Sequence, residues 1–138
     1  IACSVGTNGY VFGAEVTSHA YDIVKYDSIA NTFTKLSSKL PNKVHHGGIG
    51  RIGTNIYILG GGSSTNDNSI IKFDSETETC TTLSVTLPSG RSYLHACNIG
   101  SDIYTFGGIT AGSARTDEVL KFGFGYSYSY KKITATEV

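Results

Sequence analysis

The sequence predicts an all-β protein made of three consecutive four-stranded antiparallel units, and two observations carry this prediction. The first is an internal repeat, in which Val5–Ala14 returns 47 residues later as Ile52–Gly61 and, after another 47, as Ile99–Gly108. The second is that short stretches of alternating apolar and polar residues are separated by Gly, Asn and Asp turns, without a window of helical periodicity.

Two further blocks of sequence repeat in the same order. Asp22–Asp27 recurs as Ser69–Asp74 after 47 residues and as Glu118–Gly123 after another 49. A third block, with the pattern aromatic or Cys, two polar residues and an aliphatic residue, is found at Phe33–Leu36, Cys80–Leu83 and Tyr130–Ile133, and Leu-Pro follows its first two copies. Three blocks in fixed order define one structural unit per repeat.

Each repeat is interpreted as four short strands. The first two form a hairpin closed by Gly-Thr-Asn or Gly-Ser-Asp, residues that tolerate a positive φ. The second strand ends at a glycine pair, as at Gly60 and Gly61, where the absent side chains let another backbone segment pass closely. The third ends at Asp27 or Asp74, whose carboxylate is expected to accept hydrogen bonds from the following turn.

Composition narrows the functional classes. The 138 residues predict one domain, 1–138, and equal numbers of acidic and basic residues argue against a nucleic-acid or anionic-membrane partner. No apolar stretch approaches the roughly 20 residues of a membrane-spanning helix. Cys3, Cys80 and Cys97 form no CxxC pair and are expected to be reduced, packed thiols. These features favour a cytoplasmic protein, with a processed or secreted form as the alternative.

The repeat resembles the kelch repeat of β-propeller proteins. The second copy carries the resemblance through Ile56-Tyr57, Gly60-Gly61, Phe73-Asp74, Pro88 and Arg91. Departures from the pattern are Gly13-Ala14 at the glycine pair, Phe33, Cys80 and Tyr130 at the tryptophan position, and Phe122-Gly123 at the third aromatic-Asp.

The resemblance implies that each repeat forms one propeller blade, with blades at about 1–41, 42–88 and 89–138. Propellers usually have about 4–8 blades, so three blades make half of a six-bladed ring or a fragment of a longer propeller. A single blade cannot bury both of its faces. We therefore expect a homodimer that closes a six-bladed ring, with Val11 and Ile23 exposed on one terminal face and Ile103 and Val119 on the other.

Kelch propellers commonly bind partners through loops at one end, and the resemblance implies the same end here. These loops follow the second and fourth strands and comprise residues 15–20, 62–68, 109–117, 42–46 and 89–93. The predicted function is a non-catalytic module for protein–protein interaction. The candidate partner-binding residues are His45, His46, Asn66, Asp67, Arg91, Tyr93 and Arg115. For Arg91 a role in blade packing is the preferred interpretation, whereas Arg115, in the enlarged third loop, is the preferred contact.

No catalytic motif is present, so neither catalysis nor a cofactor is predicted. A metal site is not predicted either, because His45 and His46 are adjacent and point to opposite sides of an extended chain. Two alternatives remain: a carbohydrate-binding or galactose-oxidase-like kelch enzyme, which would assemble Tyr, His and Cys around copper, and a self-assembling cytoskeletal scaffold. The alternating aromatic residues of 124–130 are expected to form a core or subunit contact, with a sugar platform as the alternative.

Overall fold

The computed structural model describes residues 1–13, 19–62, 67–110, 112–123 and 132–133. These residues form three antiparallel sheets of four strands, each with its strands in sequence order, which confirms the predicted fold class. We call the sheets blade 1, blade 2 and blade 3. Blade 1 contains β1 (Ala2–Val5), β2 (Asn8–Phe12), β3 (Ile23–Asp27) and β4 (Thr32–Lys35). Blade 2 contains β5 (Gly48–Ile52), β6 (Asn55–Gly61), β7 (Asp67–Asp74) and β8 (Thr79–Thr82).

Blade 3 contains β10 (His95–Ile99), β11 (Asp102–Phe106), β13 (Val119–Phe122) and β14 (Lys132–Ile133). Two short strands, β9 (Arg91–Ser92) and β12 (Ile109–Thr110), pair with each other outside the blades. No helix in the described part of the chain is long and apolar enough to cross a membrane. Residues 124–130, for which the sequence predicted a core or subunit contact, lie outside the described residues, and so does Tyr130 at the predicted tryptophan position.

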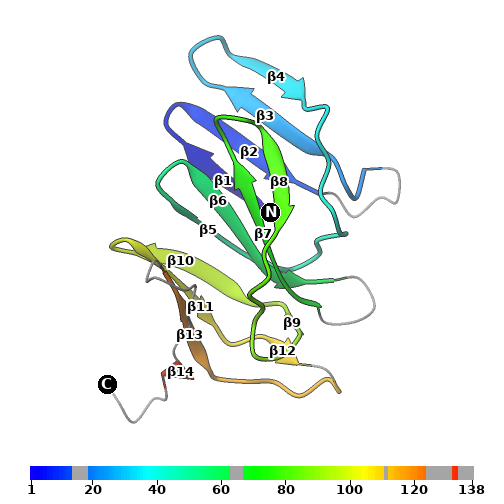
Figure 1. Ribbon diagram of the computed structural model, residues 1–138, viewed down its shortest axis with the longest axis vertical. Helices are drawn as coiled ribbons and strands as arrows, with labels where there is room; N and C mark the ends of the chain where they lie inside the picture. The colour runs from blue at the N-terminus through cyan, green and yellow to red at the C-terminus, as the bar shows by residue number, and fades with distance from the viewer. Residues whose placement is uncertain (14–18, 63–66, 111, 124–131, 134–138) are drawn as a thin grey trace.

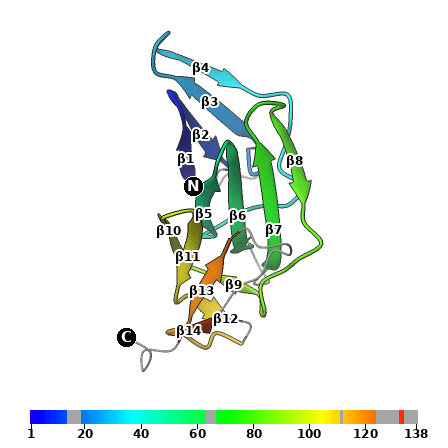
Figure 2. The ribbon, with the colours of Figure 1, turned by 60° about the vertical axis from the view of Figure 1, so that its left-hand side comes forward.

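The three blades are stacked face to face, with blade 2 in the middle (Figure 1). The first strands of successive blades contact each other, β1 with β5 and β5 with β10. These first strands therefore form the inner edge of the stack. Figure 2, turned by 60°, shows the fourth strands β4 and β8 at the edges of their sheets opposite to the first strands.

Backbone turns follow the repeat. Each first hairpin turns at a glycine of positive φ, namely Gly6 at 57°, Gly53 at 61° and Gly100 at 62°. The carboxylate of Asp27 accepts hydrogen bonds from the amides of Ile29 and Ala30, at 2.9 and 3.0 Å. Asp74 makes the same contacts 47 residues later, with the amides of Glu76 and Thr77, at 3.0 and 3.1 Å. The predicted capping of the turn by Asp is confirmed.

Blade 3 has Gly123 in place of that aspartate. A Cβ atom on Gly123 would lie 1.8 Å from Oδ1 of Asp102, so a side chain at this position would require the Asp102 carboxylate to move. Asp102 occupies the repeat position of Asn8 and Asn55 and forms an ion pair of 2.7 Å with Lys121. The carboxylate has thus moved to the facing strand of the same sheet.

Two apolar clusters join the blades. The cluster between blades 1 and 2 contains Tyr10, Phe12 and Ile23 from blade 1, Ile56, Ile58, Ile71 and Phe73 from blade 2, and the connecting Leu36, Leu40 and Val44. The cluster between blades 2 and 3 contains Tyr57, Leu59, Ile70, Leu87, Ile103, Leu120 and Phe122. Blade 2 therefore has both of its faces buried. Since successive side chains of a strand point to opposite faces, the residues of β6 are apolar at consecutive positions.

The outer faces of the two terminal blades differ from the prediction at two positions. Ile23 and Ile103 are fully buried in the clusters between blades, so their predicted exposure is wrong. Ile23 pairs with Phe12 across the strands and shares its inward face, whereas Val11 faces outward and is 44% exposed. Cys97 is also exposed, contrary to the prediction of a packed thiol, because it lies on the uncovered face of blade 3.

Candidate functional site

The connections after the second and fourth strands meet at one end of the stack, which we call the loop end. In the connection between blades 2 and 3, Arg91 and Ser92 of β9 pair with Thr110 and Ile109 of β12. Between blades 1 and 2, Nδ2 of Asn42 lies 3.4 Å from Oδ2 of Asp67. The first contact joins the connection after β8 to the connection after β11, and the second joins the connection after β4 to the start of β7.

The glycine pairs hold the connections in place. A Cβ atom on Gly61 would lie 2.8 Å from the carbonyl oxygen of His45, and one on Gly108 would lie 2.9 Å from that of Ser92. These glycines have φ values of 100° and 110°, which residues other than glycine rarely adopt. The close backbone approach predicted from the sequence is confirmed, and it fixes the chain just before His46 and Tyr93.

His46 and Tyr93 form a stacked pair at the inner edge of the loop end. They occupy the same repeat position, and both have the unusual left-handed backbone, with φ of 55° and 54°. Their ring centroids are 4.1 Å apart at an interplanar angle of 13°. Tyr93 is 56% exposed. Two successive blades thus present one flat aromatic surface immediately before their first strands.

Arg115 lies beside this pair along the main chain. It forms a bridge to Ile109, which in turn pairs with Ser92, the residue before Tyr93. Its side chain is exposed, and within the described residues it forms no ion pair. The structure therefore brings a free cation to the loop end, where the sequence placed it.

The remaining candidate residues differ in their availability. Asp67 is half-buried, and its carboxylate accepts hydrogen bonds from the amide and hydroxyl of Ser69 at 2.9 and 2.6 Å. His45 is also half-buried, and its ring lies 6.4 Å from that of His46. Asn66 lies outside the described residues.

Arg91 is buried beneath the loop end and has no exposed surface. Its Nη2 donates hydrogen bonds to Ser89 at 3.2 Å and to the carboxylate of Glu118 at 2.8 Å. The guanidinium therefore links the connection between blades 2 and 3 to Glu118, the residue just before β13 of blade 3. This position supports the packing role and does not offer the side chain to a partner.

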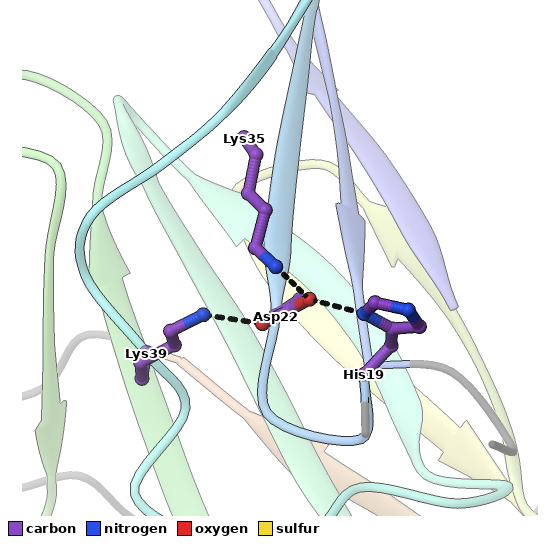
Figure 3. A network of polar contacts seen from close by, with 4 residues as sticks. All are labelled: His19, Asp22, Lys35 and Lys39. Atoms are coloured by element: carbon purple, nitrogen blue, oxygen red, sulfur yellow. Dashed lines mark hydrogen bonds and ion pairs between the residues drawn. The ribbon is translucent and has the colours of Figure 1, made fainter. Parts of the chain in front are cut away.

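Sequence reasoning missed a polar cluster around Asp22 at the edge of blade 1 (Figure 3). The carboxylate lies 2.6 Å from Nζ of Lys35 and 2.8 Å from Nδ1 of His19, and it also pairs with Lys39. Hydrogen bonds from Lys35, then Lys39 and His19, hold the pKa of Asp22 far below its usual range. The repeat counterparts of Asp22 are Ser69 and Glu118, so an acidic residue is not kept at this position in blade 2.

Beside this cluster is a hollow of about 280 Å³ on the outer face of blade 1. Val11, Val24 and Gly13 form its apolar wall, and His19, Asp22 and Lys35 form its polar rim. Val11 and Val24 face each other across β2 and β3. The hollow therefore lies on the sheet itself and is separate from the aromatic pair.

A second hollow, of about 220 Å³, lies at the opposite end of the stack, among the first hairpins of blades 2 and 3. Its lining residues are Arg51, Ile52, Gly53, Asn98, Gly100 and Ser101. Asn98 closes one side of it, accepting a hydrogen bond from the Arg51 amide at 3.0 Å and donating one to the Arg51 carbonyl at 2.5 Å. The side-chain amide of Asn98 is therefore already hydrogen-bonded to the main chain of blade 2.

Metal ligands and thiols contribute little to the chemistry of the loop end and the two hollows. Among the residues that the structure describes, no three His, Cys, Asp or Glu side chains gather as a metal site would require. Burial raises the pKa of the Cys80 thiol to about 11. Cys80 is packed against the cluster between blades 1 and 2, which agrees with the packing role expected of it.

Comparison with known proteins agrees with this architecture. A solved structure titled "Structure of YjhT" matches with a TM-score of 0.81 at 18% identity, over 96% of this chain and 50% of its own. This chain thus spans half the length of that structure. None of the curated proteins matches. The likeness, together with the stacked four-stranded sheets, defines a protein of propeller-type blades.

The family model of the Kelch motif matches residues 45–84, which contain all four strands of blade 2. This match agrees with the kelch-type repeat that the sequence predicted for this part of the chain.

Proposed function

We propose that this chain is a non-catalytic binding module that recognises a protein partner through the loop end, at the aromatic pair of His46 and Tyr93. The observation that carries the proposal is that both rings are exposed although the repeat fixes their backbone. Each of the two residues has a positive φ, and the carbonyl oxygen of the residue before it lies against a glycine, Gly61 or Gly108. A rigid, solvent-exposed aromatic surface is suited to contact a partner at little cost in conformational entropy.

The surroundings suggest the chemistry of the partner. Arg115 is an exposed cation whose main chain bridges to Ile109, the partner of Ser92 next to Tyr93. A segment with a planar or apolar side chain beside a carboxylate fits this arrangement. Asp67 is mostly engaged within the chain, and we assign it a supporting role.

Affinity capture with the chain as bait, followed by quantitative mass spectrometry, tests the proposal. The decisive variants are His46→Asn and Tyr93→Asn, because asparagine removes the ring but tolerates the left-handed backbone. We expect each to reduce capture of the specific partner at least tenfold with an unchanged melting temperature. Thr54→Ala, at the exposed hairpin end, is the control and should leave capture unchanged.

The same experiment separates the alternatives. Partner capture that survives both ring variants and is lost in Thr54→Ala would move the site to the hairpin end and overturn the proposal. A flat aromatic pair also suits the apolar face of a sugar ring, which is the specific observation in favour of a carbohydrate ligand. Glycan-array binding that disappears in Tyr93→Asn would identify a carbohydrate as the ligand in place of a protein.

A further inference from the structure

The two ends of the stack carry sheet faces without a neighbour in the described structure. We call the side of a blade that looks toward the following blade its forward face, and the opposite side its backward face. The forward face of blade 3 exposes Ile99 by 54% and Phe106 by 39%. The backward face of blade 1 exposes Val11 by 44% and Phe33 by 72%.

The junctions inside the chain show what each of these positions does when it has a neighbour. On the forward face of blade 1, Phe12 lies 5.2 Å from Phe73 of blade 2, edge to face. It shares its apolar cluster with Ile58 and Ile71, which oppose each other on the backward face of blade 2. At the next junction, Leu59 takes the position of Phe12 and packs with Leu120 and Phe122 of blade 3.

The four exposed apolar residues of the two terminal faces have buried or packed counterparts at these junctions. Phe106 is the repeat counterpart of Phe12, and Ile99 is that of Val5, which packs against the first cluster. On the other face, Phe33 is the counterpart of Cys80, which packs against the same cluster. The two faces are therefore the two halves of one more junction.

The hollow on the backward face of blade 1 corresponds to the place on the backward face of blade 2 where Phe12 packs. Its walls, Val11 and Val24, are the counterparts of Ile58 and Ile71, and with a volume of about 280 Å³ the hollow has room for an aromatic side chain. We propose that Phe106 of a second copy of this chain enters this hollow. Blade 3 of each copy then packs on blade 1 of the other, and the pair closes a six-bladed ring.

The polar contacts of an internal junction can be repeated there as well. Lys25 on the forward face of blade 1 forms an ion pair of 2.8 Å with Glu78 of blade 2. The counterpart of Lys25 in blade 3 is Lys121, and the counterpart of Glu78 in blade 1 is Asn31. Asn31 and Glu78 have the same φ of 54°. The new junction would thus place Lys121 beside a neutral acceptor, without repulsion between like charges.

Symmetry favours a second copy as the occupant. Each chain contributes one forward and one backward face, so two copies satisfy both faces by a single twofold axis. Obligate dimers bury roughly 2,000 Å² or more, and we expect two blade-on-blade junctions to reach this range. This inference does not depend on the proposed partner site, which lies at the loop end.

Light scattering on the purified 138-residue chain at micromolar concentration is the first test. The expected mass is twice 14.7 kDa. A folded monomer would overturn the proposal and assign the missing neighbours to another polypeptide or to further sequence of a longer chain.

Two substitutions locate the contact. Phe106→Asp and Val11→Asp act on opposite faces, and each should convert the dimer to monomer. Ile29→Glu is the matched control: Ile29 is 80% exposed, and its repeat counterpart is Glu76, which is exposed beside a covered face. This variant should remain a dimer. Circular dichroism verifies that each chain is folded, and a folded dimer in both Asp variants would overturn the proposal.

Mixing the two Asp variants decides the pairing of the faces. The heterodimer has one intact junction, from Phe106 of one copy and Val11 of the other, so the mixture should associate where neither variant alone does. If blade 1 packed on blade 1, Phe106→Asp alone would stay dimeric and mixing would restore nothing. That pattern contradicts the proposed arrangement.

Asn31→Glu is a gain-of-function test. It introduces the residue that blade 2 has at this position, so it should pair with Lys121 of the second copy and tighten the dimer a few-fold at low salt, with loss of the gain at high salt. The exposed thiol of Cys97 gives an independent measure, since its alkylation should slow as chain concentration rises. An alkylation rate that does not depend on concentration would count against a covered blade 3.

Discussion

Blade 2 and the two terminal blades have nearly the same sequence pattern but very different environments. Tyr10, Tyr57 and Tyr104 occupy one repeat position on the forward face of their blades. Tyr10 and Tyr57, which have a following blade, are 1% and 0% exposed, whereas Tyr104 is only half-buried. The repeat thus determines which face a side chain points to, and the neighbour determines whether that face is buried.

The largest expected effect separates the middle blade from the last one. Tyr57→Ala should reduce the free energy of unfolding by about 3–5 kcal/mol, as for other buried aromatic truncations. Tyr104→Ala should cost less than about 1 kcal/mol in the dilute, monomeric chain, because its ring already contacts solvent. Urea unfolding of both variants measures the difference. Equal losses would mean that the repeat position alone sets stability.

The two junctions also differ from each other, through the residue that lies four positions before each first strand. At the junction of blades 2 and 3 this residue is the buried Arg91, paired with Glu118, whereas its counterpart at the first junction is the buried Val44. Arg91→Ala removes the buried guanidinium together with its hydrogen bonds to Ser89 and Glu118, and should cost about 3 kcal/mol.

Arg115→Ala is the control for this prediction, because its exposed side chain should contribute less than about 0.5 kcal/mol. Thermal unfolding by calorimetry compares the two variants. Similar melting temperatures for Arg91→Ala and the parent chain would contradict the packing role of Arg91.

A smaller effect concerns acid stability, in which blade 1 differs from blade 2. The pKa of Asp22 is lowered in the folded state, mainly by Lys35, and that of Asp27 is lowered by the amides of Ala30 and Ile29. A lowered carboxyl pKa adds stability above the unfolded value of about 3.9, and this contribution is lost as pH falls through the folded value. Asp22→Asn should therefore lose less stability on acidification than the parent chain.

Urea midpoints measured from about pH 5 down to about pH 2 check this prediction, since the window includes the unfolded pKa of aspartate. Asp74→Asn serves for comparison, because the pKa of Asp74 is lowered in the same direction by the amides of Thr77 and Glu76. An acid profile of Asp22→Asn parallel to that of the parent chain would show that the Lys35 and Lys39 contacts contribute nothing in solution.

The sequence predicted the strands and their order because the apolar alternation and the turn residues are local signals. It also predicted the role of Gly61 and of Asp74, since each satisfies a backbone requirement within one repeat. It did not predict the stacking of His46 on Tyr93, which depends on how two blades are placed. The cluster at Asp22 was missed because its partners lie on both sides of β3 in the sequence, His19 before it and Lys35 and Lys39 at and after the end of β4.

The wrong assignments have one physical cause. Ile23 and Ile103 were placed on outer faces although they alternate with Val24 and Tyr104, the residues that do face outward. A single-residue shift in the assumed phase of a strand moves every side chain to the other face. The blade boundaries at about 41 and 88 and the predicted partner remain predictions.

We propose that the outer faces of the two terminal blades are halves of a junction, which is completed when two chains associate. Melting temperature as a function of chain concentration tests this proposal most directly, because association stabilises the folded state by mass action. We predict a melting temperature that rises steadily between roughly 1 and 100 μM, by several degrees. A melting temperature that stays constant over this range, in a chain that unfolds reversibly, would contradict it.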